Sequence, residues 1–598
     1  MESMMTNMYR VAVKIDQQRS IVIFVMYSTY HMYAFHNAKQ EALASLKKAI
    51  GKGVDIGIDD LELPPNPAMG DIAFPCFVLA KKQKANPVEI ARELAAKIGP
   101  TDLIEKTVAT GPYVNFVLND ITFTKAVLGE VAEMGEKYGN GTVGEGVKVL
   151  IEGAQPNTHK EFHVGHIRNA VYPVAVQRVL KASGYEVVFA AYIGDIGAHV
   201  AKALWGLDKF HKDEEFAKED RAKKLGEIYT EATTYAEEHE EAKEEIAQVQ
   251  RHLEAQEEPW HSKWQETREW SMDAFREIFK ELNVEPDVWY FESEVEEPGK
   301  KLVQKMLTDG IATKSQGATV VDLEAEDLSV FLVLKSDGSS LYATKDLPLA
   351  FKKDEKYDAD RYLYVVDVRQ SFYFQQLFAT LKRLGFKKQL THLSYDMVNL
   401  PEGTMSSRKG NIVTYAYLRD HMREYLEGET RARHEDWSDK QVVQTAAVLQ
   451  HAAMTFMMLR QDPQSIITFD IKEAMSFDGF TGPYILYTIA RIMRVQEKAS
   501  SKGEINIDLL NHPLEQQLIR RLSEYPDVVA RAASSYNVAP VAAWAFETAK
   551  LFSEYYHQVQ IIGDDLDGMA TRVGMAQAVA HVLTLAMDLL GIDVLKEM

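Results

Sequence analysis

The stretch VKVLIEGAQPNTHKEFHVGHIRNAVYPVAVQRVLKASGYEVVFAAY, residues 147–192, decides the fold class of this chain. It begins with a short apolar run at 147–151, which is followed by a loop rich in Gly, Pro and Asn. A helical pattern starts near His163 and ends at Gly184, and residues 187–192 form a second apolar run. A strand, a crossover helix and a second strand make a β-α-β unit, which predicts a Rossmann-type parallel sheet in an α/β domain.

The chain before this unit predicts a small α+β domain over 37–120. Residues 38–50 carry apolar residues at helical spacing, Pro87 suits the first turn of a second helix, and 111–118 alternates like a strand. Residues 121–146 are expected to be a linker helix.

Residues 1–36 form an N-terminal extension whose apolar run, 21–27, is too short and too polar to span a bilayer. A signal peptide is the alternative, but no small-residue cleavage site follows the run. We interpret the segment as a dispensable extension or as the product of an upstream start.

The chain after the unit predicts the rest of a large α/β domain over 147–435 and an all-helical domain over 436–598. A helical insertion is expected at about 205–318, and the excess of acidic residues within it favours solvated helices. Strand-like runs resume at 319–323, 330–334 and 362–366. Five long amphipathic stretches then predict the helices of the C-terminal domain, at 440–461, 481–500, 513–533, 538–562 and 570–590.

The composition limits the classes of protein that are possible. A chain of 598 residues with 46% hydrophobic residues can bury several cores, and such a length suggests about three or four domains. The net charge of -21 argues against a simple basic nucleic-acid module, but it allows a basic face for an RNA partner. The single cysteine, Cys76, excludes an internal disulfide and a cysteine-rich zinc site. A cytoplasmic protein with no structural metal and no membrane span is expected.

The sequence His163-Val164-Gly165-His166 lies between the first strand and the helix of the β-α-β unit. Ligands of open α/β sheets bind at this edge, and the N-terminus of a helix favours anions. Gly165 lets a ligand approach the backbone, and the two imidazoles can donate hydrogen bonds to phosphate oxygens. The pattern favours a nucleotide site such as one for ATP, and a pair of ordinary helix-start histidines is the alternative.

A second motif, GTMSSRKGN at 403–411, places hydroxyl and cationic side chains between glycines. A loop of this kind can close over a pyrophosphate leaving group and neutralise its charge. For this motif alone, a basic surface turn is the alternative.

Together the two motifs resemble those of class I aminoacyl-tRNA synthetases, and the second is similar to the version found in arginyl-tRNA synthetases. Three further elements resemble that family in the same order: a Gly-Asp-x-Gly element at 192–197, a Y-x-x-x-D motif at 342–346 and a Q-x-x-H-F element at 370–374. The resemblance covers residues 38–598. It implies a tRNA-binding N-terminal domain, a catalytic domain and a helical anticodon-binding domain.

The resemblance implies an arginine–tRNA ligase. Such an enzyme activates L-arginine with ATP to arginyl-adenylate and pyrophosphate, then transfers the arginyl group to the 3′ end of tRNA(Arg) and releases AMP. This reaction needs no protein nucleophile, so catalysis would come from positioning and charge stabilisation. Mg²⁺ is expected to accompany ATP, and a monomer is the expected state.

The resemblance also implies the residues of the site. The residues expected to bind arginine are Glu152, Asn157, Glu292, Tyr342, Asp346 and Gln370. Those expected to bind ATP are His163, Gly165, His166, Met397, Val398, Met405 and Ser406. Those expected to act in catalysis are Lys160, His163, His166, Ser406, Ser407, Arg408 and Lys409.

The arginine side chain explains the acids in this set. Its guanidinium is a planar fork of donors, which a bidentate carboxylate distinguishes from the point charge of lysine. Asp346 and Glu292 match the family positions that read the guanidinium. Asn157 and Gln370 match those that hold the α-amino and carboxyl groups.

The motifs depart from the family pattern at several positions. The class usually carries K-M-S-K-S, and here Thr404 and Ser407 replace its two lysines. Lys160, three residues before the HVGH motif, stands where arginyl enzymes carry a compensating lysine. Tyr373 stands where the family usually has histidine, and His199 stands where glutamine is common.

The residues expected to bind tRNA lie on the helical domain and combine aromatic rings with cations. They are Tyr484, Tyr487, Arg491 and Arg494. Further candidates of the same kind are Lys498, Arg520, Arg521 and Tyr536. The alternative is that most of these tyrosines are core residues.

Rival functions stay open at this point. A class I synthetase for lysine is the closest, but it is expected to lack the set Tyr342, Asp346 and Gln370, and a cysteinyl enzyme would need a zinc site. A catalytically silent paralogue that only binds tRNA is another, and the intact HVGH, Lys160 and MSSRKG argue against it.

Overall fold

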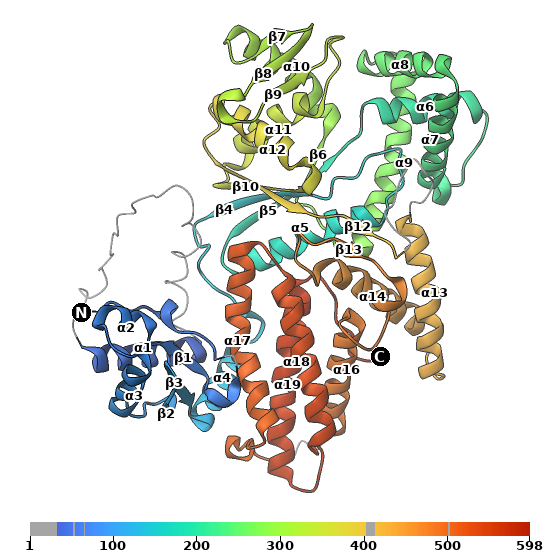
Figure 1. The fold of residues 1–598 in the computed structure, drawn as a ribbon. Helices are drawn as coiled ribbons and strands as arrows, with labels where there is room; N and C mark the ends of the chain where they lie inside the picture. Colours follow the sequence, from blue (N-terminus) through green and yellow to red (C-terminus); the bar gives the residue numbers. More distant parts are fainter. Residues whose placement is uncertain (1–32, 52–53, 65, 402–412, 500–502) are drawn as a thin grey trace, which may run out of the picture.

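The computed structural model describes residues 33–51, 54–64, 66–401, 413–499 and 503–598. They form an N-terminal domain, a catalytic domain built on a parallel sheet, and a C-terminal helical bundle (Figure 1). The bundle lies beside the N-terminal domain, and the catalytic domain lies above both in this view. The fold class expected from the sequence is therefore confirmed.

The N-terminal domain is a three-stranded antiparallel sheet packed with helices. Its strands, in spatial order, are β1 (Ile72–Pro75), β3 (Tyr113–Leu118) and β2 (Ile104–Thr110). Its helices are α1 (Ala34–Ile50), α2 (Phe77–Gln83) and α3 (Pro87–Lys97). Asn86 caps α3 by accepting the N–H of Val88, and Pro87 occupies the first turn as predicted.

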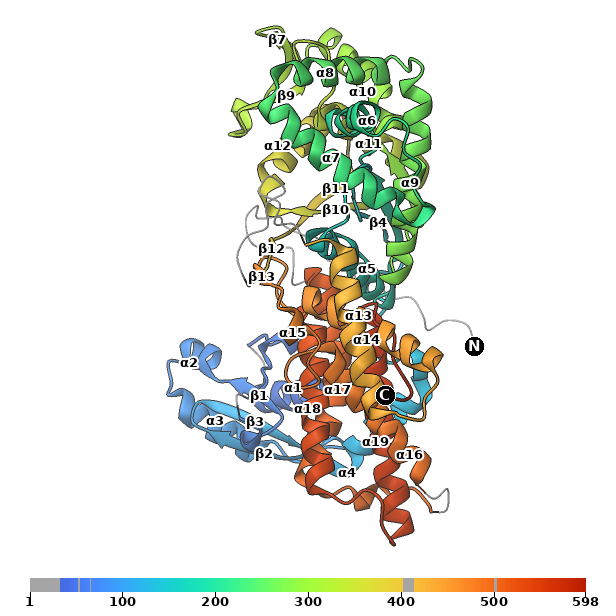
Figure 2. The same cartoon turned by 90° about the vertical axis from the view of Figure 1, so that its right-hand side faces the viewer.

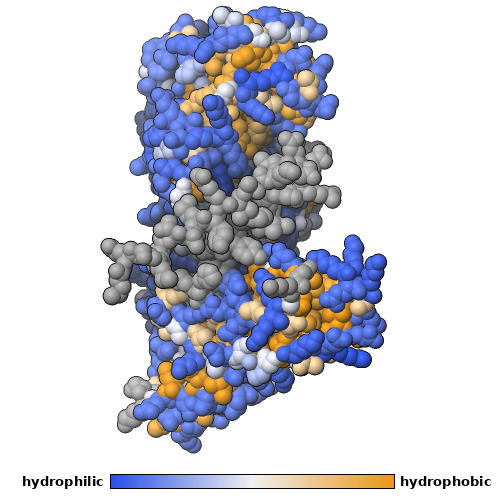
Figure 3. Space-filling model, turned by 90° about the vertical axis from the view of Figure 1, so that its left-hand side faces the viewer, coloured by the Kyte–Doolittle hydropathy of each residue, from blue (hydrophilic) through white to orange (hydrophobic). Residues whose placement is uncertain are grey.

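Helix α4 (Asp120–Met134) follows this domain and packs against the bundle. Arg520 of the bundle pairs with both Asp71 and Asp120, which ties the N-terminal domain to it. The N-terminal domain also exposes apolar side chains, and Figure 3 shows the apolar surface on it. The most exposed are Leu63, Phe77, Val78 and Val108.

The central sheet of the catalytic domain has five parallel strands, and it confirms the predicted β-α-β unit. Their spatial order is β11 (Gln389–Tyr395), β10 (Arg361–Asp367), β4 (Lys148–Gly153), β5 (Glu186–Ile193) and β6 (Val288–Phe291). Helix α5 (Val164–Ala182) is the crossover between β4 and β5.

Four helices are inserted between β5 and β6, and they face the viewer in Figure 2. They are α6 (Ala198–Phe210), α7 (Arg221–Glu238), α8 (Glu240–Glu254) and α9 (Trp260–Glu281). The range 205–318, expected to be a helical insertion, also contains strand β6 of the central sheet, so that expectation was wrong at its C-terminal end. A four-residue strand has too little local periodicity to be recognised without its partner β5.

The runs predicted as strands at 319–323 and 330–334 form a separate antiparallel sheet. It consists of β7 (Thr313–Ser315), β8 (Ala318–Asp322) and β9 (Val330–Leu334). Helices α10 (Glu292–Thr308) and α11 (Tyr342–Tyr357) pack together beside it, and α12 (Ser371–Arg383) follows β10.

The C-terminal bundle contains the five long helices that the sequence predicts. They are α14 (Asp439–Leu459), α16 (Gly482–Lys498), α17 (Pro513–Ser535), α18 (Ala539–Gln558) and α19 (Leu566–Leu589). The short helix α15 (Ile471–Ala474) lies among them, and α13 (Tyr415–Arg433) precedes them. The domain is not purely helical, because β13 (Ile467–Thr468) pairs with β12 (Val398–Asn399).

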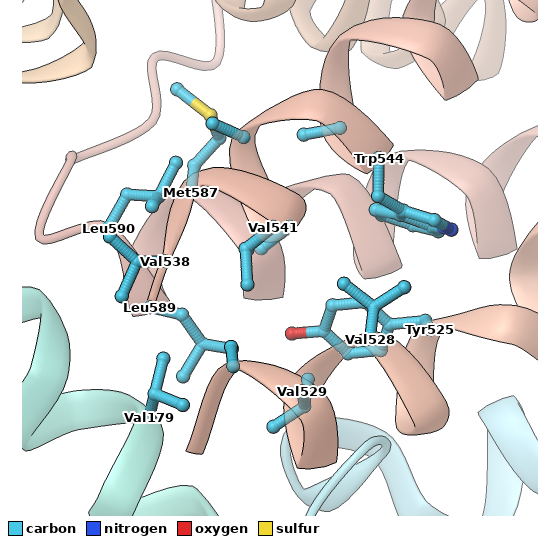
Figure 4. Packing of buried hydrophobic residues seen from close by; sticks show 14 of the residues in the cluster. Val179, Tyr525, Val528, Val529, Val538, Val541, Trp544, Met587, Leu589 and Leu590 are labelled. Atoms are coloured by element: carbon cyan, nitrogen blue, oxygen red, sulfur yellow. The ribbon is translucent and has the colours of Figure 1, made fainter. Parts of the chain in front are cut away.

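One hydrophobic core joins the bundle to one face of the central sheet. Val179 of α5 lies beside bundle residues such as Val529 and Leu589 (Figure 4). Helix α14 is long and apolar enough to cross a membrane by length and composition, but 78% of its apolar window is buried inside the protein. It is therefore a core helix of the bundle.

Candidate active site

The HVGH motif forms a reciprocal cap at the start of α5. The Nδ1 atom of His163 accepts the N–H of Gly165 at 3.1 Å, and the Nδ1 atom of His166 accepts the N–H of His163 at 3.1 Å. The two rings stack with their centroids 3.8 Å apart. Since both Nδ1 atoms accept, each neutral ring carries its proton on Nε2.

The environment keeps both rings neutral. Burial, with the nearby charge of Lys160, lowers the pKa of His163 to about 4. Burial, His163 and Lys160 lower the pKa of His166 well below its usual value. The motif therefore offers neutral Nε2–H donors near pH 7, and the cation beside them is Lys160.

Residues 413–415 form backbone hydrogen bonds with the segment that contains the HVGH motif. The N–H of Val164 donates to the carbonyl of Val413 at 3.2 Å, and the N–H of Tyr415 donates to the carbonyl of Phe162 at 2.8 Å. The expected site residues Met405, Ser406, Ser407, Arg408 and Lys409 lie within 402–412, outside the described residues.

The other two residues expected at the ATP site lie just before that segment. Val398 is buried in the core, where β12 pairs with β13, and Met397 is half-buried beside it. The structure places their backbone at the boundary of the catalytic domain and the bundle.

Three acids expected in the arginine site form one buried cluster with two lysines. Glu152 of β4 pairs with Lys353 at 2.5 Å, and Glu292 at the start of α10 pairs with Lys345. Asp346 of α11 accepts a hydrogen bond of 2.5 Å from the hydroxyl of Tyr373. Three carboxylates face two ammonium groups, so these five side chains are one positive charge short of balance.

Two carboxyl groups of this cluster, those of Asp346 and Glu292, have raised pKa values. Burial raises the pKa of Asp346 to about 6, and the hydrogen bond from Tyr373 opposes that rise. Burial likewise raises the pKa of Glu292 to about 7, and Lys345 opposes it. A bound cation would favour the ionised form of both carboxyl groups.

The two lysines were not predicted from the sequence, although their positions relative to Asp346 could have indicated them. Lys345 precedes Asp346 directly, and Lys353 follows it by two helical turns, on the same face of α11. The charge of Lys353 could be assigned to Glu152 only from the fold, because the two residues are 201 positions apart.

A buried carboxylate outside the predicted set holds the start of α10. Asp195 accepts the N–H of Ser293 at 2.9 Å and its hydroxyl at 2.7 Å. It also accepts Nε of Arg268 in α9 at 2.7 Å. Because Ser293 follows Glu292, this contact fixes the backbone that carries Glu292, an acid expected in the arginine site. The Gly-Asp-x-Gly element marked Asp195 in the sequence without assigning it a role.

Tyr192 is a further residue that sequence reasoning did not place in the site. Its pKa is raised first by burial and then by Asp346, Glu292 and Glu152, so it adjoins all three acids. Among the described residues its hydroxyl has no hydrogen-bond partner.

The remaining arginine-site candidates lie at the same edge of the sheet. Tyr342 is 65% exposed at the first turn of α11, and the charges of Glu292 and Asp346 act on it. The backbone of Asn157 pairs with Gly194 at the end of β5. Gln370 is exposed at the N-cap of α12, after the end of β10.

The two departures from the family pattern have partners in the structure. Tyr373 donates to Asp346, so a hydroxyl contacts this carboxylate where histidine is usual. His199 lies 3.3 Å from the carbonyl of Gly194, and burial followed by Lys160 lowers its pKa well below its usual value.

Part of the expected tRNA-binding set lines one cleft on the bundle. The cavity has a volume of about 250 Å³ and is lined by Tyr487, Arg491, Arg494, Lys498 and Tyr556 among others. The guanidinium of Arg491 lies 4.6 Å from the ring centroid of Tyr487 and 5.3 Å from that of Tyr556. Tyr484 is not among the lining residues: its hydroxyl donates to Ser553 at 3.2 Å.

Three further candidates have structural partners instead. Arg520 joins the N-terminal domain to the bundle, and Arg521 pairs with Glu524 and Glu547 within the bundle. The hydroxyl of Tyr536 accepts a hydrogen bond from Arg361 of the catalytic domain. Their side chains therefore have partners within the protein, and their assignment to tRNA stays a prediction.

A parallel sheet with an HVGH cap at its carboxyl edge is typical of class I aminoacyl-tRNA synthetases. A family model described as "tRNA synthetases class I (R), catalytic domain" matches residues 130–458. Models described as "Arginyl tRNA synthetase N terminal domain" and "DALR anticodon binding domain" match residues 37–118 and 485–598. The chain belongs to the arginyl-tRNA synthetase family.

Relatives support this membership, and solved structures share the fold. The chain is 35% identical to a protein of Bdellovibrio bacteriovorus named arginine–tRNA ligase, over 92% of this chain and 98% of that protein. It is 34% identical to one of the same name from Treponema denticola, over 90% and 95%. In fold it is similar to the Thermus thermophilus arginyl-tRNA synthetase, with a TM-score of 0.75, 24% identity and coverage of 94% and 100%. The Plasmodium falciparum arginyl-tRNA synthetase gives a TM-score of 0.73, 18% identity and coverage of 95% and 100%.

Proposed function

We propose that this protein activates L-arginine with ATP and transfers the arginyl group to tRNA(Arg). The observation that carries the proposal is the buried cluster of Glu152, Glu292 and Asp346, which lacks one positive charge. It lies at the carboxyl edge of the sheet whose neighbouring helix carries the HVGH cap. A guanidinium would complete the charge of the cluster.

In the first step, the arginine carboxylate attacks the α-phosphorus of ATP, and pyrophosphate leaves. His163 and His166 would donate Nε2–H hydrogen bonds to the phosphate oxygens, and Gly165 would leave room for the nucleotide at the start of α5. Lys160 would supply the positive charge, because both lysines of K-M-S-K-S are replaced. Mg²⁺ enters with ATP as part of the substrate.

The residues of the arginine site would have different roles. Asp346, whose carboxylate is not paired with a lysine, would take the guanidinium fork together with Glu292, and Tyr342 would cover it. Glu152, neutralised by Lys353, would hold the site in place. Asn157 and Gln370 would bind the α-amino and carboxyl groups of the substrate.

Several parts of the proposal rest on the family resemblance. Arg408 and Lys409 would neutralise the departing pyrophosphate, and the hydroxyls of Ser406 and Ser407 would donate hydrogen bonds to it. Met405 would contact ATP, and Met397 and Val398 would present backbone to the adenosine. In the second step, the 3′-terminal ribose hydroxyl of tRNA attacks the adenylate carbonyl, and AMP leaves. A monomer that acts in the cytoplasm is the simplest state for this reaction.

The experiment that tests the function is ATP–pyrophosphate exchange with each amino acid in turn, with and without tRNA. Exchange that depends on arginine, followed by arginylation of tRNA(Arg), is the expected result. Exchange with lysine would overturn the specificity, and no exchange with any amino acid in the presence of tRNA would favour the silent paralogue.

We also propose that the cleft at Tyr487, Arg491 and Arg494 binds the anticodon arm. Replacing Arg494 by alanine is expected to raise the KM for tRNA by roughly tenfold, because one phosphate or base contact is lost. The KM for arginine should not change. Aminoacylation measured at several salt concentrations checks this, and a shallower salt dependence is expected.

Arg531 supplies the matched control for that variant. It is an exposed arginine on α17, and Arg531→Ala should leave the KM for tRNA as it is. Equal effects of the two substitutions would refute a specific role for the cleft. The aromatic residues Tyr484 and Tyr487 are separated by the same assay, since only Tyr487 lines the cleft.

A further inference from the structure

The helical insertion touches the HVGH loop through helix α7. Gly226 of α7 lies against Glu161, two residues before the motif, and a Cβ atom at Gly226 would lie 2.4 Å from the Glu161 Cγ atom. Such a distance is impossible for a side chain, so the backbone of α7 approaches the loop directly. The insertion is therefore packed on the candidate ATP site at this point.

One turn further along α7, the ring of Tyr229 meets two lysines. The Nζ atom of Lys160 lies 5.0 Å from the ring centroid, and the Nζ atom of Lys202 in α6 lies 5.6 Å from it. These distances are within the range of cation–π attraction. In the part of the chain that the structure describes, neither ammonium group has a salt bridge, so the half-buried ring is their common partner.

The backbone that carries Lys160 is also held by the insertion. His159 has a left-handed backbone with φ of 61°, and its side chain is fully buried. Its N–H donates to the Ser271 hydroxyl at 3.0 Å, and its Nε2 lies 2.8 Å from the Thr267 hydroxyl. Both partners belong to α9, so the insertion holds the backbone before Lys160 through α9 and the ammonium group through α7.

The ammonium group of Lys160 faces the site. Its charge is among the causes that lower the pKa of His163, His166 and His199. A lysine has a flexible four-carbon stem, so an ammonium group that is needed at one point must be confined there. The aromatic face of Tyr229 confines the ammonium group and leaves its charge in place, whereas a carboxylate in the same position would neutralise that charge.

We propose that Tyr229 is a positioning residue that holds Lys160 at the ATP site, so that the insertion forms a wall of the catalytic machinery. This inference rests on the proposed role of Lys160 in arginine activation. It gives the insertion a function, where the sequence favours a set of solvated helices.

The first test is substitution of Tyr229 by leucine, which keeps the apolar bulk and removes the aromatic face. We expect a fall of roughly tenfold in the rate of arginyl-adenylate formation, the size of one half-buried cation–π contact. The KM for arginine should change little. Tyr229→Phe keeps the aromatic face and should restore most of the rate, because the attraction does not need the hydroxyl.

Tyr235 supplies a matched control on the same helix. Its ring packs on Trp205, Phe210 and His239, inside the insertion. Tyr235→Leu disturbs the insertion without touching Lys160, so it should leave adenylate formation nearly unchanged. Equal losses in Tyr235→Leu and Tyr229→Leu would mean that damage to the insertion, and not the contact with Lys160, lowers the rate.

A double-mutant cycle with Lys160→Ala tests whether Tyr229 acts through Lys160. Single-turnover adenylate formation at high enzyme concentration would be measured for both single variants and the double variant. If Tyr229 acts through Lys160, its substitution should cost less than twofold once Lys160 is absent. An undiminished tenfold loss in that background, or Tyr229→Phe as slow as Tyr229→Leu, would overturn the proposal. Absence of arginine-dependent activity in the unaltered enzyme would instead refute the proposed function.

Discussion

Replacing Lys160 by alanine is expected to lower arginine-dependent ATP–pyrophosphate exchange by roughly a hundred- to a thousandfold, which is typical when one preorganised charge-stabilising group is lost. The usual K-M-S-K-S lysines are replaced by Thr404 and Ser407, so Lys160 carries more of the task of balancing phosphate charge. Its ammonium group adjoins neutral His163 and His166, which can donate hydrogen bonds but add no charge.

The loss should appear in the chemical step and not in folding. The side chain of Lys160 contacts the ring of Tyr229 and has no salt bridge among the described residues, so removing it leaves no buried charge without a partner. The melting temperature should therefore stay close to that of the unaltered protein. Lys218→Ala, which removes an exposed lysine just before α7, is the control for a general change in charge. Unchanged exchange kinetics in Lys160→Ala would contradict the assignment.

Replacing Asp346 by asparagine is expected to raise the KM for arginine by roughly a hundred- to a thousandfold. Removing one partner of a buried ion pair costs about 3–5 kcal/mol, and each 1.4 kcal/mol is about tenfold. The change keeps the size of the side chain and its contact with Tyr373, but it leaves the guanidinium without a full countercharge. Initial rates of adenylate formation over a range of arginine concentrations measure the effect.

The pH dependence of arginine binding should identify the same carboxylate. With a pKa of about 6 for Asp346 and about 7 for Glu292, both raised by burial, the empty site takes up protons as the pH falls through this range. Protons then compete with the arginine cation. The KM for arginine should rise by up to about tenfold per pH unit between pH 7 and 6 and by up to about a hundredfold per unit below 6, where both groups are protonated, and it should be flat above about 8.

Two variants complete that test. Asp346→Asn should lose the part of the pH dependence that belongs to this carboxyl group. Glu294→Gln is the control, because Glu294 lies on the same helix as Glu292 but pairs with Lys352 at the surface. A pH-independent KM in the unaltered enzyme, or an equal loss of affinity in Glu294→Gln, would show that the cluster does not read the guanidinium.

The candidate active site shows which features could not be predicted from the sequence. The acids Glu152, Glu292 and Asp346 were predicted from the positions they share with the family, and the structure brings them together, but their charge partners could not be predicted. Whether a buried carboxylate can accept a substrate cation depends on the lysine it already contacts. Arg520 and Arg521 likewise have partners within the protein that the sequence did not indicate.

The sequence by itself determined the local features of this protein. The β-α-β unit, the proline-started helix α3 and the five long bundle helices follow from periodicity and from residues that begin or end a helix, which are interactions over a few positions. The HVGH cap is likewise local, because its two hydrogen bonds join residues two and three positions apart.

Only the tertiary structure decided which distant side chains meet. Strand β6 is recognisable through its pairing with β5, and Lys353 finds Glu152 across 201 residues. The ring of Tyr229 lies on a helix that the sequence predicts to be solvated, yet packing places the ring next to the ammonium group of Lys160. Such contacts depend on how whole helices and strands pack against one another. A short-range sequence pattern does not determine which side chains of separate elements will be in contact.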